Sequence, residues 1–193
     1  MKFNDELKTL ALEITDLETI ELSDIPDIDL YMDQVTTFME TKLSYYKRGK
    51  DDKILTKTMI NNYTKAKLFP SPVKKKYNKN HIMLLIIIYH LKSILSINDI
   101  NILLKPITTQ LVTNVKSKTL EVVYSNFVVI QKNIKTTELE QSFTNQHILG
   151  ALDIDQSMEN VEIVENILLV LFFAVISNTE KRLAEKILDT KFK

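Results

Sequence analysis

The chain has 193 residues, 45% of them hydrophobic, with 25 basic residues balanced by 25 acidic ones and no cysteine. This length and apolar content can build a core, while the lack of cysteine excludes disulfides, thiolate metal sites and cysteine nucleophiles. Two glycines and four prolines supply too few turns for an all-β or doubly wound fold, and they cannot form a phosphate loop. We therefore expect an all-α fold.

The balanced charge hides a strong segregation along the chain. Residues 1–40 contain eleven acidic residues and two lysines, whereas residues 41–80 contain eleven lysines, Arg48 and only two acidic residues. A local positive field of this kind is typical of surfaces that bind a phosphate backbone. A solvated lysine-rich face is the ordinary alternative. The two segments could also pair with each other inside the chain.

The first two helices are predicted from capping and stop signals. Asp29 can cap a helix over residues 30–46, and a polar linker follows up to Lys53. A second helix is expected over 55–67, where Pro70 and Pro72 prevent its continuation. The inward stripe of the first helix is predicted as Tyr31, Val35, Phe38, Met39 and Tyr46.

Further helices follow to the end of the chain. Asn78 can cap a third helix that carries the apolar run 82–89 on to Leu95, and Ser96 with Asp99 resembles a capping box for a short helix stopped by Pro106. Helices are expected near 107–116 and 118–132. The last predicted signals are a capping box at Thr137 and Glu140, a C-terminal Gly150 and a long final helix opened by Ser157.

The second helix carries the most specific signal, because its two sides differ in chemistry. Its inward side would hold Leu55, Met59, Ile60, Tyr63 and Ala66, with Asn62 at the flank, nearer the core. Small polar and basic groups on the outer side suit a helix in the major groove, since amides pair with adenine and lysines reach phosphates. An ordinary amphipathic helix is the alternative. The outer side is predicted as Lys57, Thr58, Asn61, Thr64 and Lys65.

These residues belong to a longer pattern that resembles the winged helix-turn-helix domain of MerR-type regulators. The matching stretches are Ile60 to Tyr63, Leu68 to Pro70, Tyr77 with Asn78, Leu91 to Ile100, and Leu103 with Leu104. Residues 25–35 and 55–63 resemble more closely a small bacterial family with a MerR-like fold, catalogued as domain of unknown function 1836. The resemblance covers about residues 20–105.

The resemblance implies a DNA-binding fold, and with it a bacterial transcriptional regulator that reads double-stranded DNA with helix 55–67. It also implies a short basic wing over 73–77 that grips phosphates. Two features depart from the MerR pattern: Asn61 replaces a phosphate-gripping arginine, and the segment 40–54 is longer than the usual turn. Tyr63 is expected to pack inside. The wing residues are Lys74, Lys75, Lys76 and Tyr77.

Three segments are therefore expected: an acidic helical segment over 1–24, a MerR-like domain over 25–106, and a C-terminal helical bundle over 107–193 for dimerisation or effector binding. No effector can be named from the sequence. The apolar runs are shorter than the roughly 18 residues of a membrane span, and no leader pattern opens the chain. We expect a cytoplasmic protein without a membrane partner.

Other classes of function have weaker support. His81, His90 and His147 lack a second ligand at metal-binding spacing, so we expect no metal, no cofactor and no enzyme. Capping and solvation explain the carboxylate pairs at 153 with 155 and at 162 with 165. A helical adaptor that binds another protein through the acidic N-terminal segment remains the alternative to DNA binding.

The final helix is apolar on every side over 167–176, so it must be buried in one chain's bundle or against a second copy. Recognition of DNA by one small helix is weak, which favours a symmetric dimer that reads two half-sites. The expected interface residues are Ile167, Val170, Leu171, Phe172 and Phe173.

Replacing Phe172 with Glu tests this interface. In a dimer interface the change yields a folded monomer with much weaker specific DNA binding, because each half-site supplies only part of the free energy. In an internal core it buries an unpaired charge and unfolds the bundle. Light scattering with circular dichroism separates the two results, and a wild-type protein that is already monomeric contradicts the dimer.

Overall fold

The computed structural model describes residues 19–47, 49–113 and 118–144, with 133–144 as backbone only, and single positions between 177 and 192. The chain divides into two compact units. One unit comprises Leu17–Gln131 with Leu188–Lys193, and the other comprises Met1–Asp16 with Lys132–Ile187. The first unit contains nearly all of the described side chains, and the fold below is that of this unit.

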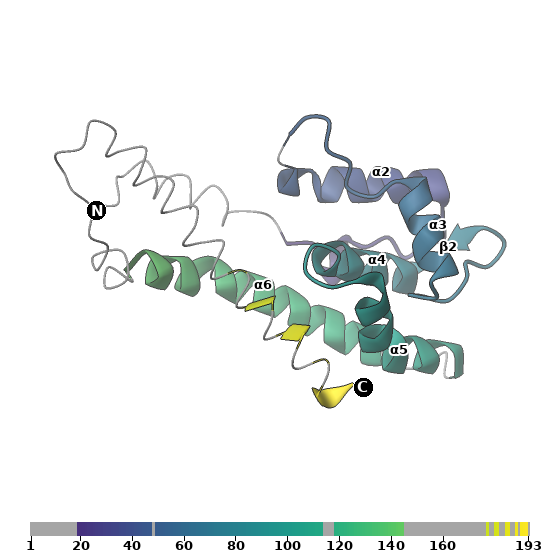
Figure 1. The fold of residues 1–193 in the computed structure, drawn as a ribbon. Helices are drawn as coiled ribbons and strands as arrows, with labels where there is room; N and C mark the ends of the chain where they lie inside the picture. Colours follow the sequence, from purple (N-terminus) through teal and green to yellow (C-terminus); the bar gives the residue numbers. More distant parts are fainter. Residues whose placement is uncertain are drawn as a thin grey trace. The chain divides into compact units, whose positions relative to one another are not determined.

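The described part is mainly helical, as expected, with one small two-stranded sheet (Figure 1). Strand β1 pairs antiparallel with β2, with Leu30 opposite Tyr77 and Tyr31 opposite Lys76. The elements in chain order are the 3-10 helix η1 (Leu22–Asp24), β1 (Leu30–Tyr31), α2 (Met32–Lys42), the 3-10 helix η2 (Ser44–Tyr46), α3 (Lys57–Lys65), β2 (Lys76–Tyr77), α4 (Lys79–Leu91), α5 (Ile97–Thr113) and α6 (Thr119–Thr144).

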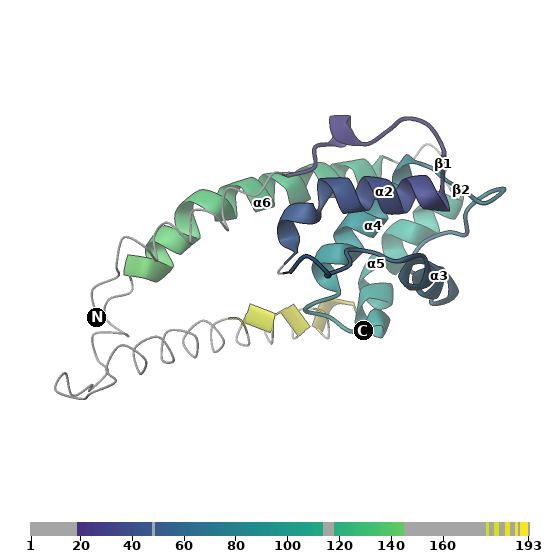
Figure 2. The same cartoon turned by 90° about the horizontal axis from the view of Figure 1, so that it is seen from above.

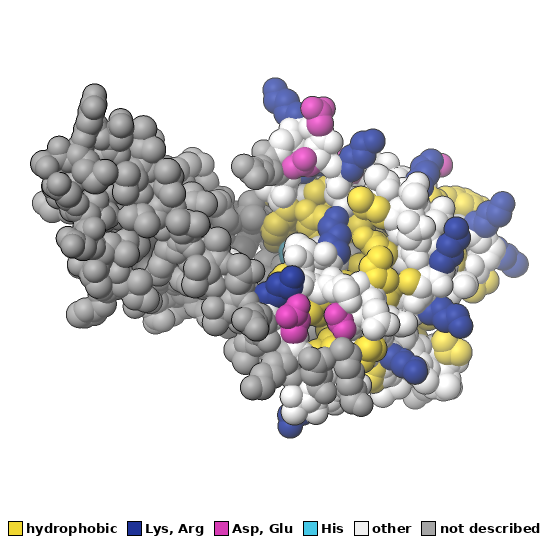
Figure 3. Space-filling view, in the orientation of Figure 1, with side chains coloured by type: hydrophobic (Ala, Val, Ile, Leu, Met, Phe, Trp, Pro, Cys, Tyr) yellow, Lys and Arg dark blue, Asp and Glu magenta, His cyan; other side chains and the backbone are white. Residues whose placement is uncertain are grey.

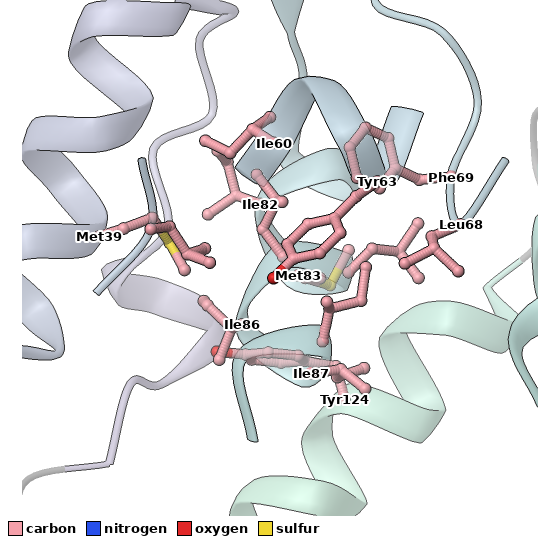
Figure 4. Close-up of a cluster of buried hydrophobic side chains, with 14 of the residues drawn as sticks. Met39, Ile60, Tyr63, Leu68, Phe69, Ile82, Met83, Ile86, Ile87 and Tyr124 are labelled. Atoms are coloured by element: carbon pink, nitrogen blue, oxygen red, sulfur yellow. The ribbon is translucent and has the colours of Figure 1, made fainter. Parts of the chain in front are cut away.

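Helix α4 forms the centre of the core. Its eight consecutive residues 81–88 are all buried, so its neighbours must cover it on every side. In the views of Figures 1 and 2, α4 lies in the middle, with α3 and β2 at one end. Figure 4 shows Ile60 and Tyr63 of α3 beside Ile82 and Met83 of α4.

The start of α2 differs from the sequence prediction. Leu30 and Tyr31 form strand β1, so α2 begins at Met32 and its N-cap is Tyr31, whose backbone N–H donates to the Gln34 side chain at 2.8 Å. The predicted Asp29 cap is therefore wrong. Tyr31 is 53% exposed, which also contradicts its inward placement. Val35 and Met39 are buried as predicted, while Phe38 and Tyr46 are half-buried and Tyr46 lies in η2.

The predicted caps of α4 and α5 are confirmed. The Asn78 side chain accepts from the backbone N–H of His81 at 3.2 Å, and α4 ends at Leu91, four residues earlier than expected. The Ser96 hydroxyl accepts from the backbone N–H of Asp99 at 3.2 Å and donates to its carboxylate at 2.7 Å.

The predicted helix stop at Pro106 is wrong, because α5 continues without a break to Thr113. Proline removes one backbone hydrogen bond from a helix interior. Pro106 is exposed, while Ile100 and Leu104 are buried on the opposite side and hold the helix against the core. The expected domain boundary at 106 and 107 therefore coincides with the middle of a helix.

The predicted break before Thr137 is also wrong. Helix α6 is continuous over Thr119–Thr144, and its sequence contains no glycine or proline that would end it. The expected Gly150 cap, the Ser157 helix and the 167–176 run lie outside the described residues. Within the described part of the chain, no helix is long and apolar enough to cross a membrane.

His90, near the end of α4, packs among aromatic rings. Its ring centroid lies 5.0 Å from that of Tyr46, 5.5 Å from that of Tyr89 and 5.3 Å from that of Phe127. The Gln131 side-chain nitrogen lies 3.2 Å from His90 Nε2, a contact that suits a neutral imidazole as acceptor. Burial lowers the pKa of His90 to about 4 from an ordinary value of 6.5.

This shift predicts how stability depends on pH. Because the folded pKa lies below the unfolded one, the unfolded chain binds more protons between about pH 6.5 and 4, and the protein loses stability as pH falls through that window. The loss should reach about 2 to 3 kcal/mol. Denaturant unfolding at several pH values should give a flatter profile for His90→Phe, and equal slopes for both proteins contradict the assignment.

Asp24, an exposed carboxylate with a shifted pKa, does not obscure this test. The pKa of Asp24 lies below its ordinary value of 3.8, mainly because the Glu21 backbone N–H donates to it, and its stabilisation is lost only as pH falls below that value. His81, whose pKa burial also lowers, acts in the same direction as His90 and is present in both proteins.

Candidate functional site

Both ends of helix α3 are fixed by local geometry. The Thr56 hydroxyl caps the N-terminus by accepting from the Met59 backbone N–H at 3.1 Å. At the C-terminus, Lys67 adopts a left-handed conformation with φ of 59°, and the Leu68 N–H donates to the Tyr63 carbonyl at 3.0 Å. This is a Schellman ending with lysine where glycine is usual. The helix therefore presents its faces in a defined orientation.

The two faces of α3 are those predicted from the sequence. Ile60 and Tyr63 are 0% and 6% exposed, and burial raises the pKa of Tyr63. Tyr63 thus packs inside, as expected. Asn62 is exposed, so its predicted place near the core is wrong. On the outer side, Lys57, Thr58, Asn61 and Lys65 are exposed and Thr64 is half-buried.

Thr64 is partly covered because it joins α3 to the small sheet. Its hydroxyl donates to the Ile60 carbonyl at 3.0 Å, and its side chain is hydrogen-bonded to that of Tyr77. Tyr77 is only 3% exposed and burial raises its pKa. Its predicted phosphate contact is therefore not available in this structure, because its ring belongs to the core rather than to the surface.

The predicted wing is a tight β-hairpin. Val73 and Lys76 form an antiparallel bridge, closed by a bond from the Lys76 N–H to the Val73 carbonyl at 2.9 Å. The two residues between them, Lys74 and Lys75, have φ of 52° and 63°, as in a type I′ turn. Such turns favour Asn-Gly, because a left-handed backbone costs other residues about 1 to 2 kcal/mol. Both lysine side chains are exposed at the hairpin tip.

Two further exposed residues, Tyr31 and Lys67, were not predicted as site residues from the sequence. Tyr31 stands opposite Lys76 in the sheet, and the Lys76 ammonium lies 5.2 Å from the centre of its ring. Lys67 lies just after the end of α3, and the feature that distinguishes it is its left-handed backbone conformation. Neither the strand pairing nor the positive φ has a local sequence signal of the usual kind, such as glycine.

His81 anchors the base of the hairpin to α4. Its Nδ1 accepts from the Asn78 backbone N–H at 3.1 Å, so its Nε2–H donates to the Pro70 carbonyl at 2.9 Å. The rings of Phe69 and Tyr77 pack edge-on against it, with centroids 5.8 and 5.6 Å away. Burial lowers the pKa of His81, which keeps the ring neutral. Its role here is structural.

Ion pairs link the acidic and basic segments, as one of the sequence alternatives proposed. Four lysines of the basic segment pair with carboxylates of residues 24–40, and each such exposed pair contributes about 0 to 1 kcal/mol. The pairs are Lys42 with Asp24 at 3.1 Å, Lys79 with Asp27 at 2.6 Å, Lys47 with Glu40, and Lys57 with Asp33.

In the part of the chain that the structure describes, the pairing leaves a set of lysines without acidic partners. Among the described residues, no carboxylate lies within 4 Å of Lys65, Lys67, Lys74 or Lys75. In Figure 3, Lys and Arg side chains are spaced over the part of the surface built by α3, the hairpin and α5, where few acidic side chains are seen. The site is therefore a basic surface with small polar groups at its centre.

The described residues hold no group of three or more His, Cys, Asp or Glu side chains that could bind a metal ion. His147, the carboxylate pairs beyond residue 150 and the predicted interface residues Ile167, Val170, Leu171, Phe172 and Phe173 lie outside the described part.

Comparison with curated proteins and with solved structures finds no match for the chain. One family does match, over residues 20–127, and its description is "Domain of unknown function (DUF1836)". The matched region begins before β1 and extends through α2, α3, β2, α4 and α5 into the first part of α6. Because it covers more than half of the chain, the protein belongs to the DUF1836 family.

Proposed function

We propose that this protein is a bacterial transcriptional regulator that binds double-stranded DNA, with α3 in the major groove and the lysine hairpin on the phosphate backbone. The observation that carries the proposal is the exposed polar face of α3, where Lys57 is the one described lysine paired with a carboxylate, beside two lysines held at a hairpin tip. Duplex DNA matches both features, since its groove offers base edges and its rim carries phosphates.

The outer face of α3 has the side chains that base recognition needs. The Asn61 amide can donate and accept at once, which matches the major-groove edge of adenine. Thr58 is short enough to approach a base edge or a thymine methyl group. Lys57 lies at the start of the helix, and its ion pair with Asp33 is exposed on both sides, with 60% and 77% of the side chains accessible. It can therefore exchange that carboxylate for a phosphate.

The backbone of the hairpin tip supports a role for its lysines. Strained residues are often found at functional sites, where the side chain matters more than the cost of the conformation. Lys74 and Lys75 occupy two positions where Asn and Gly would be more stable. Retaining lysine at both positions costs stability, and phosphate binding by the exposed ammonium groups would explain that cost.

The order of elements supports the winged helix-turn-helix interpretation. Helix α2, helix α3 and the hairpin follow one another and pack on α4, and β1 before α2 pairs with β2 of the hairpin. A helix, a second helix and then a basic wing is the order that the MerR resemblance implies, whereas strand β1 was not predicted. The departures also persist: residues 43–56 between α2 and α3 include η2 and exceed a simple turn, and Asn61 stands in place of arginine.

A protein-binding adaptor is the second candidate, and α6 provides its support. Four apolar side chains on this helix, at 122, 123, 129 and 130, are exposed by 37% to 58%. Exposed apolar groups at helical spacing are typical of a surface that binds another protein. This surface is compatible with DNA binding as well, because a regulator that acts as a dimer would need a contact surface between its two copies.

Replacing Lys74 with Asn and Lys75 with Gly should change stability and DNA binding in opposite directions. The preferred residues of a type I′ turn should raise the free energy of unfolding by about 1 to 2 kcal/mol. Loss of two phosphate contacts should weaken binding to all duplexes alike and lower the salt slope by up to about 1.8. Denaturant unfolding and fluorescence anisotropy at several salt concentrations measure both effects.

The double alanine variant of the same lysines is the matched control. It removes the same charges but leaves a left-handed backbone that alanine also disfavours, so its salt slope should fall without a gain in stability. If both variants keep the wild-type salt slope, the hairpin does not contact phosphate.

Replacing Asn61 or Thr58 with Ala should instead change sequence preference. A good base contact contributes about 1 to 3 kcal/mol of discrimination, so the preference at one position of the site should relax. Selection of bound fragments from random duplexes, followed by competition binding, measures this change. Asn98→Ala, an exposed residue of the same type on α5, is the control. Equal loss on every sequence would show that Asn61 and Thr58 only position the domain.

A further inference from the structure

A groove lies beside the end of α3, between the segment that follows this helix and α5. The groove is lined only by polar, basic and apolar residues, and no carboxylate takes part. Its polar lining includes Lys67 and Ser71 on one wall and Asn101, Lys105 and Thr109 on the other. We infer that this groove holds the phosphate backbone of duplex DNA next to the segment read by α3; the inference rests on the proposed function.

The α5 wall presents its polar groups in one row. Asn101, Lys105 and Thr109 are spaced four residues apart, so they lie on the same face of the helix, one turn after another. Their side chains have no hydrogen-bonding partner within the described part of the chain, and no carboxylate there lies within 4 Å of Lys105. This row offers an amide, an ammonium and a hydroxyl, which are the donors that bind phosphate oxygens.

The opposite wall begins where the exposed face of α3 ends. Thr64 belongs to both surfaces, since it lies on α3 and also lines the groove. Lys67 follows it at the Schellman ending, where the bond from Leu68 to Tyr63 fixes the backbone. The Lys67 side chain has no acidic partner among the described residues. The basic surface of α3 therefore continues into the groove without an acidic interruption.

Because the basic surface of α3 continues into the groove, the same duplex DNA can occupy both. A DNA strand that passes the C-terminal end of α3 would next reach Lys67 and the row on α5, while the hairpin contacts phosphates at another edge of the site. Contacts of this kind carry no sequence information; they set the orientation of α3 and add to the salt dependence of binding. Free phosphate and single-stranded RNA share the same chemistry and are alternatives for the test.

Two variants of the full chain test the groove. Lys105→Ala removes one ammonium from an exposed helix position, and Lys67→Gly removes another while glycine keeps the left-handed backbone. For each variant, the slope of log affinity against log salt should fall by about 0.9, with the same loss on every duplex sequence. Lys118→Ala, an exposed lysine that does not line the groove, should leave the slope unchanged. Circular dichroism verifies that each variant is folded.

The outcomes distinguish this inference from the proposed function. If wild-type protein binds duplex DNA with a preference that depends on Asn61, but both groove variants keep the wild-type slope, the groove inference is wrong and the proposed function stands. If wild-type protein binds no duplex, both fail. If Lys105→Ala weakens binding of inorganic phosphate or of a single-stranded RNA but not of duplex DNA, the groove serves another ligand and the inference is overturned.

Discussion

The complete burial of α4 is the constraint on which the rest of this structure depends. Eight consecutive residues of this helix are buried, so every neighbouring element must offer apolar groups to it. Helix α3 meets that demand through Ile60 and Tyr63, which leaves its polar side no place except the surface. His81 adds a directional contact, because its bond to the Pro70 carbonyl fixes the segment between α3 and the hairpin. The orientation of the basic surface is thus a consequence of packing around one helix.

The same surface contains three residues whose backbone conformation lowers the stability of the fold. Three non-glycine residues in the described part have positive φ, and all three are lysines: Lys67, Lys74 and Lys75. Each position would be more stable with glycine or asparagine, by on the order of 1 kcal/mol. A rigid core can tolerate this cost, since α4 and His81 hold the segments on both sides of each strained residue. Strain confined to one type of charged residue at one surface is difficult to explain by packing, and it supports ligand binding there.

The sequence predicted those features that depend on neighbouring residues. The Asn78 and Ser96 caps are confirmed because a cap involves only residues within one turn. The two faces of α3 were predicted for the same reason. Tyr31 was misplaced because strand β1 exists only through its pairing with β2, which is distant in sequence. Pro106 was predicted to end its helix because proline disfavours a helix interior. That rule does not take account of the burial of Leu104, which keeps α5 intact.

Charge pairing explains how a chain with zero formal charge can present a basic surface. Four of the five carboxylates of residues 24–40 are engaged by Lys42, Lys47, Lys57 and Lys79. Because these pairs are exposed, they contribute little to stability and are screened by salt. Their larger effect is on the electrostatic field. They neutralise acidic side chains close to the site, while no carboxylate of the described residues lies within 4 Å of Lys65, Lys67, Lys74 or Lys75. A polyanion would therefore meet a surface whose potential is positive locally although the chain as a whole is neutral.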